Sequence, residues 1–144
     1  MLVSPILFLF VLLAATLAAV VIHLIFRRAR TSNLRQLAQR WQMHFTPDDR
    51  FRIASRLAAS LGVPGAASVR VQDVIYGTEE QSYRYYFAVH YTTGVLKRKV
   101  EELSVCTVTE PREREGGDGF SPLATAPGEL TVIEQYEHLK KTAS

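Results

Sequence analysis

The sequence predicts an α+β protein in which a single transmembrane helix precedes a small folded domain. Residues 1–26 contain no Asp, Glu, Lys or Arg, which indicates a segment that leaves water. Apolar residues recur at helical spacing through residues 31–61 and then alternate along much of 69–109, which indicates helices followed by strands. We therefore expect one or two helices packed on a three-stranded antiparallel meander, with a short helix at the C-terminus.

Composition divides the chain into six segments. They are an N-terminal tail (1–4), a transmembrane helix (5–26), a basic juxtamembrane helix (27–45), an α+β domain (46–109), a linker rich in Gly and Pro (110–128), and a C-terminal helix and tail (129–144). A chain of 144 residues has room for one domain beside the anchor. The single cysteine, Cys106, excludes an intrachain disulfide framework and a zinc site with several cysteines.

Residues 5–26 form an apolar run in which only Thr16 and His23 carry polar side chains. At about 1.5 Å per residue, a helix of this length spans about 33 Å, which suffices for a hydrocarbon core of about 30 Å. The competing interpretation is a cleaved signal peptide, whose apolar core has about 7–15 residues and follows a basic segment. Here the run is longer, no basic residue precedes it and arginines follow it, so we expect a permanent anchor.

Arginines gather directly after the apolar run, and the flanking set is Arg27, Arg28, Arg30 and Arg35. Positive charge is retained on the cytoplasmic side, so we expect the N-terminus outside and the C-terminal domain in the cytoplasm, at a bacterial inner membrane. The same arginines suit contact with anionic lipid headgroups. Residues 27–56 carry a net charge of +6 and residues 57–144 of −3, so the basic character belongs to this flank and we expect no nucleic-acid binding.

Small residues in the apolar run lie four positions apart, as Ala14 with Ala18 and Ala15 with Ala19. This spacing lets two helices approach closely in a membrane. It allows a homodimer through the transmembrane helix.

Residues 31–43 are predicted to be helical because their apolar side chains recur every three or four positions. The pattern leaves open whether this helix continues from the membrane helix or lies along the membrane surface. Residues 46–49, Thr-Pro-Asp-Asp, indicate the start of a second helix, because Thr can cap the end, Pro fits the first turn and carboxylates suit the positive helix terminus. Gly62 marks its end.

Strands are predicted at 68–76, 83–91 and 95–109, separated by turns at 77–80 and 92–94. The alternation slips by one residue near Gln72, which indicates a β-bulge. Residues 130–139 fit a short amphipathic helix, although the β-branched pair within them also allows a strand.

The aromatic strand carries the candidate interaction surface. Tyr83, Tyr85, Phe87 and Tyr91 share one side, for which core packing under the helices is the favoured interpretation. The functional alternative is an exposed aromatic and basic patch that would bind an acidic partner, lipid headgroups or single-stranded nucleic acid. Its members would be Arg84, Tyr86, Lys97, Arg98 and Lys99.

The stretch Tyr-Phe-Ala-Val-His-Tyr-Thr-Thr-Gly at 86–94, followed by basic residues at 97–99, resembles a group of uncharacterised bacterial small membrane-anchored proteins. In these, an aromatic strand leads into a Tyr-Thr-Thr-Gly hairpin. The resemblance extends over roughly residues 36–109 and includes the helix around Trp41. It implies the same topology and carries no activity.

No nucleotide-binding, metalloprotease or hydrolase motif occurs, and the four histidines do not stand at metal-ligand spacing. We therefore expect no cofactor and no metal. The favoured function is a membrane-tethered, non-catalytic domain that binds a protein partner or the anionic membrane surface as an adaptor, assembly factor or accessory subunit. A structural, oligomerising component of an envelope complex is the alternative, and an enzyme with an unrecognised site is a third.

Overall fold

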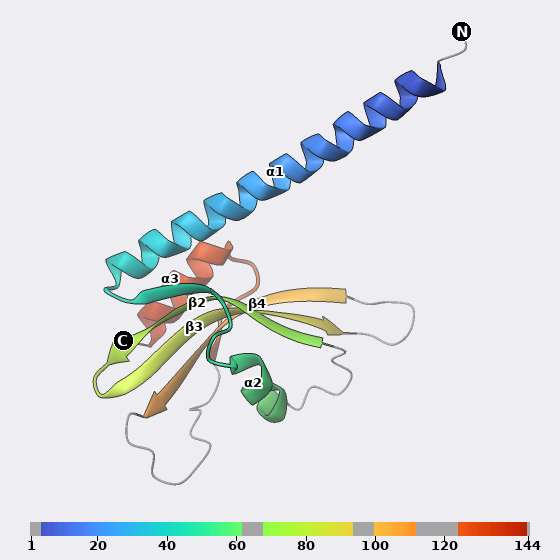
Figure 1. Ribbon diagram of the computed structural model, residues 1–144. Helices are drawn as coiled ribbons and strands as arrows, with labels where there is room; N and C mark the ends of the chain where they lie inside the picture. Colours follow the sequence, from blue (N-terminus) through green and yellow to red (C-terminus); the bar gives the residue numbers. More distant parts are fainter. Residues whose placement is uncertain (1–3, 62–67, 94–99, 112–123, 144) are drawn as a thin grey trace. The chain divides into compact units, whose positions relative to one another are not determined.

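The computed structural model describes residues 4–61, 68–93, 100–111 and 124–143. The chain divides into two compact units, Met1–Asn33 and Leu34–Ser144. The first is most of one helix and the second is a folded α+β domain built on a five-stranded sheet. Figure 1 gives the labels of the elements.

Helix α1 runs without interruption over Pro5–Arg40, so the predicted apolar and juxtamembrane helices are one element. No Gly or Pro interrupts it after its first residue. Thr16 is satisfied within the helix, because its hydroxyl donates to the carbonyl oxygens of Leu12 and Leu13 at 3.1 and 2.8 Å. The helix is long and apolar enough to span a membrane.

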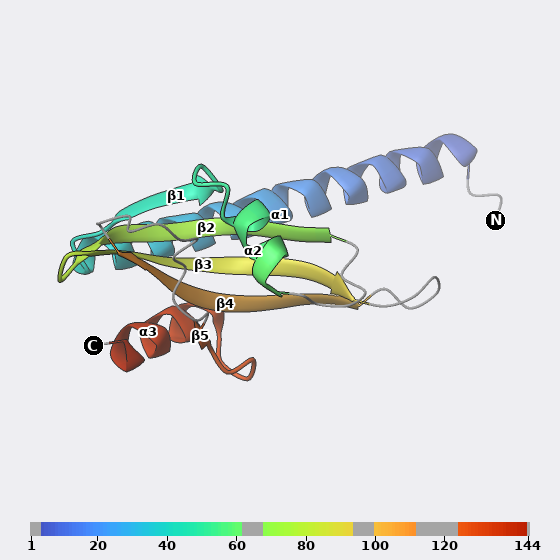
Figure 2. The same ribbon diagram turned by 90° about the horizontal axis from the view of Figure 1, so that it is seen from below.

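The domain is built on an antiparallel sheet whose strands lie side by side in chain order. The strands are β1 (His44–Asp48), β2 (Ser68–Glu79), β3 (Ser82–Thr93), β4 (Val100–Pro111) and β5 (Ala124–Thr125). The three predicted strands correspond to β2, β3 and β4, and the expected count of three was too low. Short strands β1 and β5 extend the sheet at its two edges (Figure 2).

Strand β1 occupies the segment predicted to begin a helix, which corrects that prediction. Thr46 is buried and pairs with Val74 of β2. Pro47 is tolerated because β1 is an edge strand, where a missing N–H leaves no ladder bond unmade. Helix α2 (Ile53–Leu61) begins later than expected, and one of the predicted capping carboxylates holds it: Asp49 accepts the backbone N–H groups of Ile53 and Ala54, both at 2.8 Å.

The predicted β-bulge in β2 is confirmed. The register with β3 shifts between Gln72 and Ile75, and Asp73 adopts a φ of 56°. As a result, Val71 and Val74 point to the same face of the sheet and join one core cluster. The hairpin that follows turns at Glu80 and Gln81, with φ values of 53° and 90°, so β2 extends to Glu79, into the segment predicted as a turn at 77–80.

Gly77 lies inside β2 and is not part of the turn. A Cβ at this position would lie 2.8 Å from Cγ of Met43. The glycine therefore lets the chain between α1 and β1 approach the sheet, which seals one end of the core.

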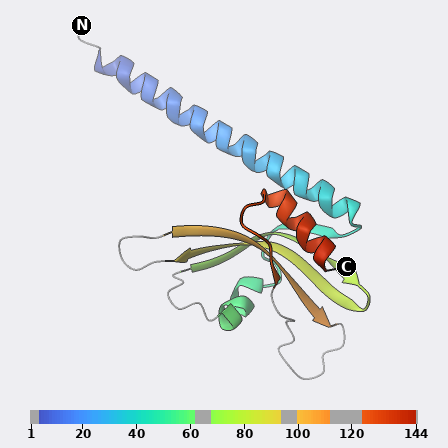
Figure 3. The same cartoon turned by 180° about the vertical axis from the view of Figure 1, so that it is seen from behind.

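Both faces of the sheet are covered, and each has its own core. The last turns of α1, from Leu34 onward, and helix α3 (Val132–Thr142) cover one face, and α2 lies on the other (Figures 1 and 3). Tyr86 and Tyr136 are fully buried in the first core, and Phe87 in the second. Burying one such side chain contributes roughly 1.5–3 kcal/mol.

The C-terminal helix is confirmed, with a helix over Val132–Thr142 and no strand at its start. At its N-terminus the Glu134 carboxylate accepts the backbone N–H of Thr131 at 2.8 Å and the Thr131 hydroxyl at 2.7 Å. Leu139 is buried against the sheet, and the Tyr136 hydroxyl donates to the backbone oxygen of Asp73 at 2.6 Å. The segment after β4 thus returns to the domain and completes its core.

Candidate functional site

Exposed apolar side chains are distributed very unevenly. Among the residues that the structure describes, the exposed large apolar side chains all lie between Ile6 and Phe26, with the exception of Tyr83. Those of the helix are 47–72% exposed and lie all around its axis. Exposing apolar side chains on every side of a helix to water is unfavourable, whereas placing the same helix in hydrocarbon is favourable.

The basic flank and the small residues of α1 lie where the sequence indicated. Arg27, Arg28 and Arg35 are exposed, and Arg30 is half-buried. The four alanines of the predicted pairing face, Ala14, Ala15, Ala18 and Ala19, are all exposed.

Tyr86, a member of the predicted aromatic and basic patch, does not lie on the surface. Tyr86 is fully buried, and its ring lies 5.4 Å from that of Trp41, centroid to centroid. Burial raises the pKa of Tyr86, and the nearby Arg84 guanidinium opposes that rise. Tyr86 is therefore a core residue, which is a correction, and Lys97, Arg98 and Lys99 lie outside the described residues.

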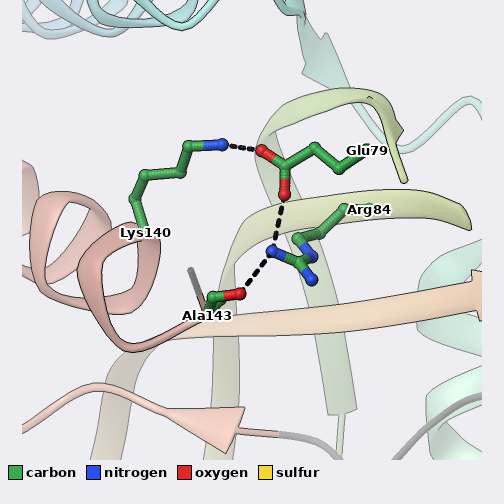
Figure 4. A network of polar contacts seen from close by, with 4 residues as sticks. All are labelled: Glu79, Arg84, Lys140 and Ala143. Carbon is green, nitrogen blue, oxygen red and sulfur yellow. Dashed lines mark hydrogen bonds and ion pairs between the residues drawn. The ribbon is translucent and has the colours of Figure 1, made fainter.

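Arg84 takes part in a polar network that joins the β2–β3 hairpin to the end of α3 (Figure 4). One guanidinium nitrogen donates to the Glu79 carboxylate at 2.5 Å and to the backbone oxygen of Ala143 at 2.8 Å. Lys140 pairs with the other oxygen of Glu79. Desolvation lowers the pKa of Lys140. The network places positively charged side chains at the C-terminus of α3, where they stabilise the helix, so its role is structural.

A second network lies on the opposite face of the sheet. Arg56 of α2 donates to Glu110 of β4 at 3.1 Å, and the Tyr85 hydroxyl donates to the same carboxylate at 3.4 Å. Burial raises the pKa of Tyr85, and the negative charge of Glu110 raises it further. These contacts fasten α2 to the sheet.

A hollow of about 500 Å³ lies where β1 ends beside β2. Its apolar lining is Ala54, Val69 and Val71. Its polar lining is Asp49, Arg70, Gln72, His90 and Thr92. The hollow brings together ionisable groups of the β1–α2 connection, β2 and β3, and sequence analysis did not identify it.

The polar groups of the hollow differ in how they are engaged. Both oxygens of Asp49 accept backbone N–H groups at the start of α2. Gln72 Nε2 lies 2.5 Å from His90 Nε2, which couples β2 to β3. Arg70 is exposed, and no carboxylate of the described residues lies within ion-pair distance of it. The hollow therefore presents a positive charge to a ligand.

A sequence signal for this site exists. Along β3, the face that carries Tyr86 and Ala88 becomes polar at His90 and Thr92, and the paired stretch of β2 becomes polar at Arg70 and Gln72. A change from apolar to polar on one face of two paired strands marks the end of the core. Reading it requires the register between the strands, which only the structure supplies.

Other chemistry has little support among the residues that the structure describes. No group of three or more His, Cys, Asp or Glu side chains in these ranges is placed to hold a metal ion. Cys106 is 4% exposed, and burial raises the pKa of its thiol, so it behaves as an apolar core residue.

Comparison with known proteins finds no matching family model, no matching curated protein and no matching solved structure. The function therefore has to be argued from the structure of this chain.

Proposed function

We propose that this chain is a membrane-tethered, non-catalytic binding domain, which serves a protein partner as an adaptor, assembly factor or accessory subunit. One observation carries the proposal: the exposed large apolar side chains of the described residues lie on residues 6–26, with Tyr83 as the exception. The domain buries its own apolar faces, while the large apolar side chains of residues 6–26 are exposed. Such a helix is stable in a lipid bilayer, whereas its exposure to water is unfavourable.

The arginines after the apolar run support one orientation. Arg27 and Arg28 are exposed at the end of that run, where anionic headgroups would contact them. No basic residue precedes it. In this proposal the N-terminus lies outside, the domain lies in the cytoplasm, and the membrane is a bacterial inner membrane.

The hollow beside β2 supports binding more than catalysis. Asp49 is held by the backbone of α2, so it is poorly placed to take a proton from a substrate. Arg70 supplies a guanidinium group, which is a positively charged hydrogen-bond donor and not an acceptor. A fixed positive charge next to an apolar wall is suited to recognition of a ligand.

Membrane fractionation tests the anchor. We expect the full chain to stay in the membrane pellet after a carbonate wash, and a reporter fused after Ser144 to be active only in the cytoplasm. A matched control moves the positive charge, by replacing Arg27, Arg28 and Arg30 with glutamine and adding lysines at the N-terminus, which should reverse the reporter signal. Recovery of the intact chain in the soluble fraction would refute the tether.

Affinity capture from detergent-solubilised membranes tests the partner. The control is the Phe87→Ala chain, which keeps the anchor and should destabilise the domain by about 3–5 kcal/mol. We expect a partner that is captured by the wild-type chain and lost from the control. Capture of the same proteins by both chains would argue against a domain that binds.

A further inference from the structure

Strand β2 is longer than the strand that pairs with its outer edge. Strand β1 pairs with β2 only along Gln72–Tyr76 of β2. Asp48, the last residue of β1, pairs with Gln72. Residues 68–71 pair with β3 on one side, and among the described residues no strand pairs with them on the other (Figure 2). In an antiparallel strand, alternate backbone N–H and C=O groups of this stretch point away from β3 and can accept another strand.

The hollow lies along this free edge and reaches both faces of the sheet. Val69 and Val71 belong to the face covered by α2. Arg70 and Gln72 point to the opposite face, beside His90. A ligand on one face would contact one of these sets, whereas an extended chain along the edge contacts both, because its side chains alternate between the two faces.

The charges of the hollow select the kind of chain. Asp49 already accepts two backbone N–H groups, and the positive end of α2 offsets its charge. Arg70 is exposed and has no ion-pair partner among the described carboxylates. An acidic side chain on the Arg70 side would form a charge-assisted hydrogen bond, and an apolar one on the other side would cover Val69, which is half-buried.

We propose that residues 68–71 of β2 bind an extended segment of a protein partner as an added strand, in which apolar residues alternate with acidic ones. The added strand continues the line of β1 past Asp48. This inference rests on the proposed binding function and names its surface and the chemistry of its partner. Backbone hydrogen bonds provide affinity, and Arg70 provides the preference for acidic residues.

The test uses the full chain in nanodiscs of phosphatidylcholine and three short labelled peptides that alternate valine with glutamate, with glutamine or with lysine. Fluorescence anisotropy should show the glutamate peptide binding at least about tenfold more tightly than the lysine peptide. Arg70→Gln should reduce the affinity for the glutamate peptide to that for the glutamine peptide. Arg40→Gln, which removes an exposed arginine of α1, should leave it unchanged.

Methylation of backbone nitrogens tests the strand geometry. Two versions of the glutamate peptide carry N-methyl groups at alternate residues, in opposite phase. Because only one edge of an added strand bonds to β2, one version should lose binding and the other should retain it. Equal behaviour of the two versions, or equal binding of the glutamate and lysine peptides, would overturn the proposal.

Two further outcomes separate this inference from its alternatives. If the peptides fail to bind while phosphatidylglycerol vesicles bind in a manner that depends on Arg70, the edge is a lipid contact and the added strand is refuted. If the chain proves soluble after a carbonate wash while the glutamate peptide binds, the tether fails and the peptide site remains.

Discussion

The apolar part of α1 and the α+β domain contain the same types of apolar residue, arranged in different sequence patterns. Phe10 is 65% exposed, whereas Phe87 is fully buried. In residues 5–26 apolar side chains surround the helix, and the large ones are 47–72% exposed. In the domain they alternate along strands, so that each face of the sheet is apolar and packs against helical residues. The period of the apolar pattern therefore decides, more than the number of apolar residues does, whether lipid or the protein's own core removes these side chains from water.

The largest expected effect is seen when one phenylalanine ring is removed from each region and the two variants are compared. Phe87→Ala should lower the free energy of unfolding of the domain by about 3–5 kcal/mol, because a fully buried ring leaves a cavity. Phe10→Ala should change it by less than about 0.5 kcal/mol. Urea unfolding of the detergent-solubilised chain, followed by the fluorescence of Trp41, measures both. Similar losses for the two variants would contradict the division into two environments.

A charge within the apolar run tests the other region. Leu13→Arg should make membrane insertion less favourable by about 2.5–3.5 kcal/mol, because a guanidinium would lie near the middle of the hydrocarbon. The fraction of chain that resists carbonate should fall, while the unfolding of the domain stays as in the wild type. Leu13→Ile is the control and should insert normally. Full insertion of the arginine variant would argue against a lipid environment for residues 5–26.

A smaller effect is expected where α3 meets the bulge of β2. Tyr136→Phe removes the hydroxyl that donates to the buried backbone oxygen of Asp73 at 2.6 Å. An unmet acceptor of this kind should cost about 1–2 kcal/mol of unfolding free energy. Tyr83→Phe, on a residue that is 40% exposed, should cost almost nothing by the same urea measurement. An equal cost would mean that the Tyr136 hydroxyl does not hold α3.

The smallest effect concerns pH and the start of α3. Hydrogen bonds from the Thr131 hydroxyl and backbone N–H hold the pKa of Glu134 below its ordinary value of 4.5. A lowered folded pKa means that this contribution to stability is present above the ordinary value and is lost as pH falls through the lowered one. Thermal unfolding of the wild type and Glu134→Gln should therefore differ near neutral pH and converge in acid. A constant difference would exclude the carboxylate as the cause.

The sequence determined the features that depend on local pattern. The uncharged run defines α1, the alternation around Phe87 defines β3, and the slip near Gln72 marks the bulge that the structure confirms. Spacing also predicted a helix over residues 130–139, although it left a strand open, and the structure forms the helix over Val132–Thr142. Each of these is encoded by neighbours in the chain, since a helix or strand repeats its pattern over a few residues.

Tertiary structure decided the rest. Thr-Pro-Asp-Asp at 46–49 satisfies the local rules for a helix start. Its first three residues instead end an edge strand, because β2 offers hydrogen bonds and a buried position for Thr46. Tyr86 alternates onto a face that the sequence left open, and α3 buries it. The hollow depends on where β1 stops along β2 and on the register that places Arg70 opposite His90. Such pairings join residues far apart in the chain, so no local pattern encodes them.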